Sequence, residues 1–300
     1  MNQSTNKPNQ LNQLINLSTN KQIANALTID VEDYYMVSAF EDVIKFEDWH
    51  RYESRVERNT HKILDLLDEY QVKATFFVLG WVAEHYPNLV RDIHASGHEI
   101  ACHGYNHRLI YHLTPDEFRE DVRIAKSILE DTIGTQVIGY RAASYSIVKR
   151  TLWALDILIE EGFLYDSSIF PVHHDRYGLP GADRFPYAIK RNNSTIVEFP
   201  PSTYRIFNQN IPIAGGGYLR LYPLQITKAV IKRINEKEKK IAILYIHPWE
   251  IDVEQPRLNG RRISRIRHYI NLKSTLPKLR YFLTEFRFGP LSSFLNGSMI

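Results

Sequence analysis

The sequence has only one cysteine in 300 residues, Cys102, and this scarcity excludes a framework of internal disulfides. It has no apolar run of about 18 residues, so it offers no candidate for a transmembrane helix. The first ten residues, MNQSTNKPNQ, lack the apolar core of a secretory signal peptide. The formal charge of +3 is too small to suggest a nucleic-acid partner. We therefore expect a cytoplasmic protein, and attachment to a membrane surface stays open.

Two common catalytic patterns are also missing. There is no G-x-S-x-G nucleophile elbow, and no glycine-rich phosphate loop follows an early strand. The glycine triplet at residues 215–217 comes late, and we expect it to form a flexible loop near the pocket. Hydrophobic residues make up 44% of the chain, which is enough for a large core.

Apolar runs of strand character alternate along the chain with stretches of helical periodicity, and this pattern predicts an α/β fold with parallel strands. Residues 114–117 (TPDE) have the pattern of a capping box with proline in the first turn. We expect helices at residues 59–70, 81–96, 114–132, 149–161 and 223–240. We expect strands at residues 26–29, 74–79, 100–102, 137–141, 163–166, 196–199 and 241–246.

The most informative segment is HEIACHGYNH, residues 98–107, which places His103 and His107 directly after an apolar run. Two histidines four residues apart can lie on one helical turn and point at one site, and imidazole is the commonest ligand of zinc-like metals. Such a pair alone is weak evidence, because many lie on solvated helices. Its place at the carboxyl end of a predicted strand, where α/β folds build their sites, favours a metal site.

A third ligand is available after the apolar run at residues 26–29, which is followed by Asp30, Glu32 and Asp33. An acidic turn is the alternative interpretation of this segment taken alone. Carboxylates at the end of a buried strand are costly to desolvate unless they are paired or bound to metal. Two histidines and one carboxylate form a recurring catalytic site with an open position for water or substrate.

Later predicted strands end in Arg141, Asp166 and His247, which should lie at the same edge. Each has a structural alternative: Arg141 could neutralise a carboxylate, Asp166 could cap a turn, and His247 could be a packed core residue. Together with a metal they suit hydrolysis of an amide or ester. A metal polarises the carbonyl and acidifies a water, a carboxylate accepts its proton, and a histidine protonates the leaving amine.

The order of these motifs resembles the polysaccharide deacetylases, the NodB-homology or carbohydrate esterase family 4 group, over roughly residues 25–250. The resemblance implies a distorted (β/α) barrel of about seven parallel strands. It also implies Asp30 as the catalytic base, Arg141 as the residue that positions it, and Asp166 as the residue that tunes the catalytic His247. The metal ligands that it implies are His103, His107 and either Glu32 or Asp33.

Three positions depart from the family pattern. The usual adjacent acidic pair is spread over residues 30–33 (DVED), Gly104 replaces a serine or threonine, and Ala142 replaces a proline. The segments HPWEIDVEQPRLNG and IRHYINL after residue 246 are similar to deacetylases of exopolysaccharide and exosortase gene clusters. This likeness extends the resemblance to about residue 288.

The resemblance implies a divalent metal, with Zn²⁺ as the first choice, and removal of N-acetyl groups from a sugar. The sugar would belong to a polysaccharide or its lipid-linked precursor in exopolysaccharide biosynthesis. One alternative is a related amidohydrolase that acts on a small amide, as an allantoinase does. Another is a catalytically silent sugar-binding scaffold. Residues beside the motifs are expected to line the substrate groove: Tyr34, Tyr35, Tyr105, Ser144, Tyr145, Tyr218 and Trp249.

The expected organisation has three parts. The first part is a flexible tail, residues 1–24, with a short helix at residues 11–17. The second is the deacetylase domain, residues 25–250, and the third is an extension packed on the barrel, residues 251–300. Residues 255–284 contain eight lysine or arginine residues and no aspartate or glutamate. This segment is either a solvated helix face or a surface that binds an anionic partner, such as an acidic polysaccharide or a lipid-linked pyrophosphate. The eight are Arg257, Arg261, Arg262, Arg265, Arg267, Lys273, Lys278 and Arg280.

Overall fold

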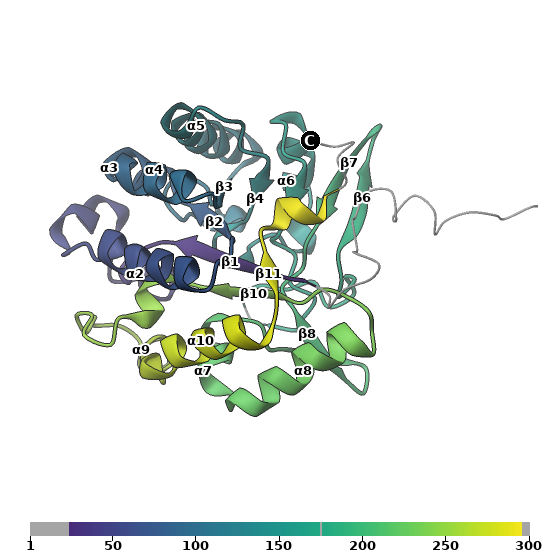
Figure 1. The fold of residues 1–300 in the computed structure, drawn as a ribbon. Coiled ribbons are helices and arrows are strands. Elements are labelled where there is room, and N and C mark those ends of the chain that lie inside the picture. The colour runs from purple at the N-terminus through teal and green to yellow at the C-terminus, as the bar shows by residue number, and fades with distance from the viewer. Residues whose placement is uncertain (1–23, 175, 296–300) are drawn as a thin grey trace, which may run out of the picture.

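The computed structural model describes residues 24–174 and 176–295, and it has an α/β fold around one mostly parallel sheet (Figure 1). The strand order is β10-β1-β2-β3-β4-β5-β7-β6, with β11 beside β1. The strands are β1 (Asn25–Val31), β2 (Thr75–Val78), β3 (Glu99–Cys102), β4 (Gly139–Tyr140), β5 (Tyr165–Asp166), β6 (Tyr187–Arg191), β7 (Ser194–Glu198), β10 (Ile243–Ile246) and β11 (Phe288–Gly289). The expected α/β class is confirmed.

The strands from β10 to β7 are all parallel, and β6 adds an antiparallel edge. Among the described residues no strand ladder joins β7 back to β10. The gap is bridged by single hydrogen bonds: the Ile243 amide donates to Ser202 Oγ (2.7 Å), and the Tyr245 amide donates to the Ala214 carbonyl (3.0 Å). No strand pairing therefore closes the sheet into a barrel at this seam within the described residues, and the expected barrel closure stays a prediction. A separate hairpin of β8 (Thr203–Ile206) and β9 (Gln209–Pro212) follows β7.

Helices cover the sheet on its outer side, and β1 is buried along its whole length. Figure 1 shows α2 to α5 along one side of β1 and β2, and α7 to α10 along β10 and the other side of β1. The helices are α2 (Val56–Glu69), α3 (Gly80–His85), α4 (Pro87–Ala95), α5 (Pro115–Ile133), α6 (Ala154–Glu160), α7 (Gly216–Leu221), α8 (Leu224–Glu236), α9 (Arg262–Tyr269) and α10 (Thr275–Glu285).

Local signals explain two of the helix boundaries. The Thr114 side chain accepts the amide of Glu117 and the Glu117 side chain accepts the amide of Thr114, so the predicted capping box is confirmed at the start of α5. The single helix expected at residues 81–96 is wrong. Pro87 disfavours helical geometry at the preceding residue, and the chain breaks there into α3 and α4. The loop expected at residues 215–217 is also wrong in part, because α7 begins at Gly216.

The chain beyond residue 250 is built into the fold. β11 pairs with β1 in parallel, and α9 packs against the short 3-10 helix at Ser38–Phe40. The expected division at residue 250 stays a prediction, and the helix expected at residues 11–17 lies outside the described residues. Within the described ranges no helix is both long and apolar enough to cross a bilayer.

Candidate active site

The carboxyl ends of β1, β3 and β10 bring together the acidic and histidine residues that the sequence singled out. Possible ligand atoms of Glu32, His103 and His107 all lie within 4.8 Å of one another, and all three residues are buried. The neighbouring strands are parallel, which is why residues far apart in the sequence meet at one edge. The three residues could therefore hold one metal ion.

The two histidines converge through a turn and not along a helix, so the expected helical arrangement is wrong. His103 directly follows β3, and the loop after it takes positive φ at Gly104 (+75°) and His107 (+59°). The positive φ of Gly104 would strain a serine or threonine at this position, and a Cβ there would also lie 2.9 Å from Asp121 Oδ2. The same oxygen accepts the Tyr105 amide at 3.0 Å and fixes the turn.

The surroundings of His103 favour its neutral form. His103 Nδ1 lies 2.7 Å from the Arg141 carbonyl, so this nitrogen carries the proton and Nε2 keeps a free lone pair. Burial lowers the pKa of His103 to about 4. Neutral imidazole is the form that binds a metal.

Glu32 faces the same point. Its Oε1 accepts Trp249 Nε1 at 3.1 Å, and its Oε2 lies 2.9 Å from His107 Nε2. This Oε2 is buried and has no hydrogen bond of good geometry, so it is an orphaned acceptor aimed into the histidine pair. Burial acts to raise the pKa of Glu32, but the nearby imidazoles, His107 first, lower it to about 2. An ionised oxygen beside two imidazoles fits a divalent cation.

Asp33, the other expected ligand, is not part of this cluster, and its assignment to the metal is corrected. Its Oδ2 accepts Ser54 Oγ (3.0 Å) and the amides of Arg55 (2.6 Å) and Val56 (3.0 Å), and its Oδ1 accepts the Tyr34 amide (2.9 Å). Asp33 therefore holds the start of α2. Strand alternation is a signal that could have distinguished the two acids, since residues 30 and 32 share one side of an extended chain and residue 33 does not.

Asp30 is held by a buried arginine. Arg141 Nη1 donates to Asp30 Oδ1 at 2.6 Å and to Thr28 Oγ1 at 2.8 Å, and its other nitrogens donate to the carbonyl and hydroxyl of Ser167. The second carboxylate oxygen, Oδ2, lies 3.8 Å from His247 Nε2. Arg141 thus orients Asp30 and leaves one oxygen facing the site.

His247 lies at the end of β10 with Nε2 3.5 Å from Glu32 Oε1. Its Nδ1 lies 2.6 Å from Glu250 Oε1. Burial acts to lower the pKa of His247, but Glu250, Glu32 and Asp30 raise it to about 9. The imidazole is therefore protonated near neutral pH and can act as an acid.

The expected role of Asp166 next to His247 is wrong in this structure, because the carboxylate at His247 Nδ1 belongs to Glu250. Ser168 Oγ donates to Asp166, and the other neighbour of Asp166 is the carboxyl group of Glu198. Burial raises the pKa of Asp166 to about 6 and that of Glu198 well above its usual range. This pair is buried and does not reach the imidazole.

Several expected wall residues are buried and cannot stack on a sugar. Tyr34, Tyr145 and Trp249 are 1%, 6% and 5% exposed, because Tyr34 packs on Tyr35 and Trp249 stacks between two histidines. Tyr145 packs between Phe170 and Tyr245. The partly exposed members of the expected set are Tyr105, Ser144 and Tyr218.

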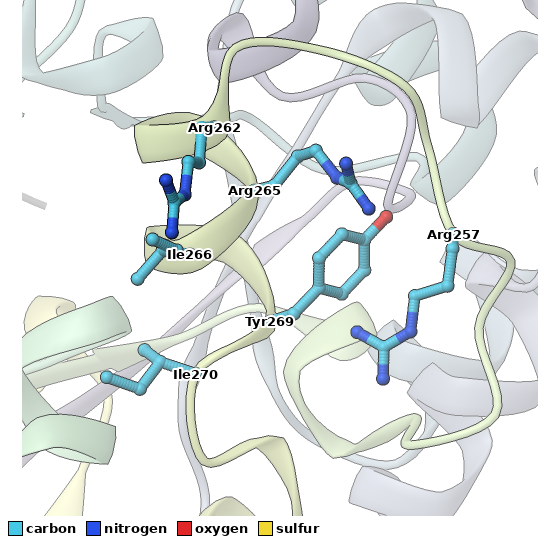
Figure 2. Close-up of a pocket in the computed structure, with 6 residues that line it drawn as sticks. All are labelled: Arg257, Arg262, Arg265, Ile266, Tyr269 and Ile270. Carbon is cyan, nitrogen blue, oxygen red and sulfur yellow. The ribbon is translucent and has the colours of Figure 1, made fainter.

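A basic pocket of about 580 Å³ lies on α9 and the preceding loop (Figure 2). Its lining includes Arg257, Arg262 and Arg265 around Tyr269. Arg257 lies over the Tyr269 ring, 4.2 Å from its centroid, and the Tyr269 hydroxyl accepts the Leu258 amide at 2.7 Å. The pocket wall is thus fixed by the loop that carries Arg257.

Two family models match the chain. Residues 36–158 match the polysaccharide deacetylase model, and residues 167–296 match a domain of unknown function (DUF3473). The fold and the site define an α/β protein with a candidate metal centre at the strand ends. Within that class, residues 36–158 are similar to the polysaccharide deacetylases. The first match includes His103, His107 and Arg141, whereas Asp30 and Glu32 precede it and His247 follows it.

Curated relatives align over part of their length. A peptidoglycan-N-acetylglucosamine deacetylase of Bacillus cereus is 43% identical over 75 residues, which are 25% of this chain and 27% of that protein. A chitooligosaccharide deacetylase of Bradyrhizobium is 29% identical over 126 residues, 42% of this chain and 55% of that protein. The chain therefore spans about a quarter to a little over half of these relatives.

Solved structures share the fold. A protein of Mycobacterium smegmatis described as a polysaccharide deacetylase superimposes with a TM-score of 0.57 at 22% identity, covering 92% of this chain and 96% of that one. The Puue allantoinase gives a TM-score of 0.52 at 18% identity, and the superposition covers 87% of this chain and 90% of the allantoinase chain. At these identities the likeness concerns the fold alone.

Proposed function

We propose that this protein is a metal-dependent N-deacetylase of N-acetylated sugars in a polysaccharide. The observation that carries the proposal is the convergence of three elements at one point. These are the Glu32–His103–His107 cluster, the Asp30–Arg141 ion pair and the protonated His247. The named activities of the relatives support it, since they are deacetylases of peptidoglycan and chitooligosaccharides.

The reaction is hydrolysis of an acetamide. Asp30 Oδ2 accepts a proton from water while the water oxygen bonds to the amide carbon, and Arg141 keeps the carboxylate in place. His247 Nε2 then gives a proton to the sugar nitrogen as the carbon–nitrogen bond breaks, which releases acetate and the amine. A bound divalent metal would polarise the carbonyl and lower the pKa of the water.

Glu32, His103 and His107 would hold this metal, and we propose Zn²⁺. Two neutral imidazoles and one carboxylate are a ligand set of catalytic zinc sites with a position left for water. The free lone pair at His103 Nε2 and the orphaned Glu32 Oε2 support this assignment.

The further details rest on the sequence. We propose a role in exopolysaccharide biosynthesis, with a polymer or its lipid-linked precursor as the substrate and the cytoplasm as the location. The residues after position 246 that resemble exopolysaccharide-cluster deacetylases support this proposal.

One experiment tests the core of the proposal. Purified protein is analysed for bound metal and then incubated with N-acetylglucosamine oligomers and, separately, with allantoin. We expect about one metal ion per chain and acetate release from the oligomers. Turnover of allantoin alone would favour the small-amide alternative, and bound sugar without acetate release would favour the silent scaffold.

The basic surface of α9 supports a second element of the proposal, contact with an anionic partner. Arg262 and Arg265 are exposed beside Ile263 and Ile266, which are 58% and 54% exposed. Basic groups near an anionic lipid surface each contribute about 1 kcal/mol, and salt screens them within about 8 Å. Exposed isoleucines next to arginines suit a membrane surface that presents lipid-linked pyrophosphate.

Sedimentation with vesicles that contain anionic lipid tests this contact at low and high salt. We expect salt-sensitive binding that is lost when Arg261, Arg262 and Arg265 are replaced by glutamate, with deacetylation of a short neutral oligomer unchanged. The charge-matched control replaces three other exposed basic residues, far from α9 in the sequence, with glutamate: Arg91, Lys149 and Arg150. Absence of binding at low salt would leave the basic segment as a solvated face.

A further inference from the structure

The catalytic histidine is held by a carboxylate from its own turn. Glu250 Oε1 lies 2.6 Å from His247 Nδ1 and also accepts the His247 backbone amide at 3.0 Å. Both residues belong to the turn around the short 3-10 helix Pro248–Ile251, and Glu250 is fully buried. With Nδ1 bound to Glu250, the imidazole can present only Nε2 to Asp30 and Glu32.

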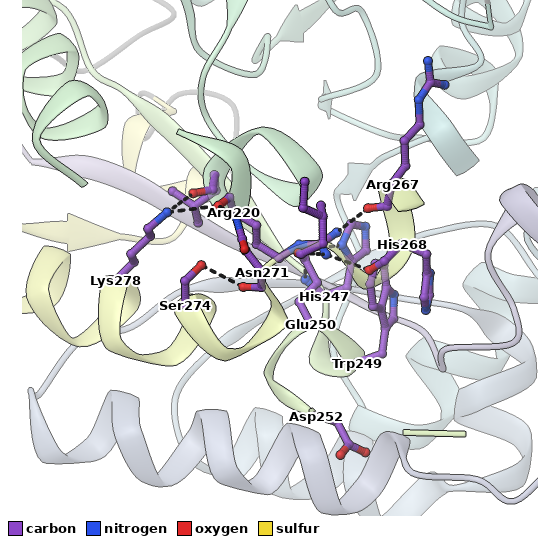
Figure 3. A network of polar contacts seen from close by, with 12 residues as sticks. Arg220, His247, Trp249, Glu250, Asp252, Arg267, His268, Asn271, Ser274 and Lys278 are labelled. Carbon is purple, nitrogen blue, oxygen red and sulfur yellow. Dashed lines mark hydrogen bonds and ion pairs between the residues drawn. The ribbon is translucent and has the colours of Figure 1, made fainter. Parts of the chain in front are cut away.

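A buried arginine fixes that carboxylate from the other side (Figure 3). Arg220 of α7 donates from Nε to Glu250 Oε2 at 2.6 Å, and it is 2% exposed. Its remaining nitrogens donate to the carbonyls of Arg267 (3.3 Å), His268 (2.7 Å) and Ile270 (2.8 Å) at the end of α9. A buried carboxylate is costly unless it is paired and hydrogen-bonded, and Arg220 supplies that partner. The carboxylate is therefore rigidly oriented.

The same turn also supports the candidate metal ligand. The Trp249 ring stacks on the His247 ring, with 5.1 Å between the ring centroids, and on the His268 ring of α9, with 4.1 Å between the centroids. Its Nε1 donates to Glu32 Oε1. His268 is in turn fixed by Gln255, whose Oε1 lies 2.8 Å from His268 Nε2. Through these contacts α9 forms the back wall of the site.

We infer that Glu250, anchored by Arg220, is the positioning residue that orients His247 for proton transfer, so that the region matching the domain of unknown function completes the active centre. This inference rests on the proposed deacetylase function. The competing explanation is that the Arg220–Glu250 pair only fastens α9 to the barrel. Asp166 is the other candidate for the role, but its neighbours are Ser168 and Glu198.

Glu250→Gln removes the charge and keeps the size of the side chain. Two matched variants separate the explanations. Asp252→Asn removes a buried carboxylate two residues away, which bonds to Arg55 and to Arg58 and Asn59 of α2; Figure 3 draws no dashed contact from this carboxylate to the other residues shown. Asp166→Asn removes the carboxylate that the family pattern predicts for this role.

We expect Glu250→Gln to lower kcat by about 10- to 100-fold, the usual cost of removing a supporting hydrogen-bond partner, with KM and metal content near those of the wild type. Asp252→Asn should lose stability but keep kcat. The inference would be overturned if Asp252→Asn lost as much kcat as Glu250→Gln. It would also be overturned if Glu250→Gln kept the wild-type kcat while Asp166→Asn lost it.

A second measurement does not depend on turnover. In protein with ¹⁵N-labelled histidine, the His247 ring signals should shift in Glu250→Gln and stay in place in Asp252→Asn. Unchanged His247 signals in Glu250→Gln would also overturn the inference. If the wild type releases no acetate from any oligomer, the proposed function fails, and these signals still decide whether Glu250 orients the imidazole.

Discussion

Replacing Asp33 with asparagine should weaken the fold and leave the metal site intact. Three donors converge on Asp33 Oδ2, namely Ser54 Oγ and the amides of Arg55 and Val56, and the Tyr34 amide donates to Oδ1. An asparagine side chain can turn its oxygen to the three donors only by placing its NH₂ group against the Tyr34 amide. One buried donor is then left without an acceptor, which costs about 1–3 kcal/mol.

The assay is denaturant unfolding together with metal analysis after dialysis. We expect the free energy of unfolding of Asp33→Asn to fall by that amount, with a Tm lower by roughly 2–10 °C, and metal content to stay at the wild-type level. Glu32→Gln is the matched control: it should lose most of its metal with a smaller change in stability. Asp33→Asn protein that folds with wild-type stability but lacks metal would refute the assignment of these two acids.

Four further outcomes follow from the geometry. Asp30→Asn should lower turnover by about 100-fold, the usual scale for loss of a general base, with metal retained; near-normal acetate release would contradict the role. His247→Ala should have a similar effect. The proposed role of His247 requires its protonated form, and its pKa is raised to about 9, so wild-type kcat/KM should be sustained below that pH and fall above it; a flat profile to pH 10 would count against it as the acid. Gly139→Ala should destabilise the fold by about 1–3 kcal/mol in thermal unfolding, because a Cβ there would lie 2.0 Å from the Tyr165 ring.

The strand-end chemistry was readable from the sequence because each residue directly follows a recognisable apolar run. Asp30, His103 and His247 are examples, and the structure brings them to one edge of the sheet. Their partners were harder to predict. The bond from Arg141 to Thr28 spans 113 positions, and the Arg220–Glu250 pair spans 30, with no local pattern that marks the contact.

For several of the incorrect predictions, the sequence does contain a local signal that indicates the observed structure. Pro87 marks the break between α3 and α4, and strand alternation separates Glu32 from Asp33. Glu250 stands three residues after His247, which is the spacing of a capping side chain that reaches back to the chain amide. The burial of Tyr34 and Trp249 had no such signal, because an aromatic ring beside a motif looks the same in sequence whether it packs in the core or faces a groove.

The residues of the candidate site are spread over both regions that match family models. The match to the deacetylase family ends at residue 158, yet His247 and Glu250 lie within the region of unknown function, and Arg220 and His268 support them from α7 and α9. β11 of that region also pairs with β1, the strand that carries Asp30. A truncation after the first match would remove the proposed acid and β10, the parallel neighbour of β1. The region of unknown function is therefore structurally inseparable from the site.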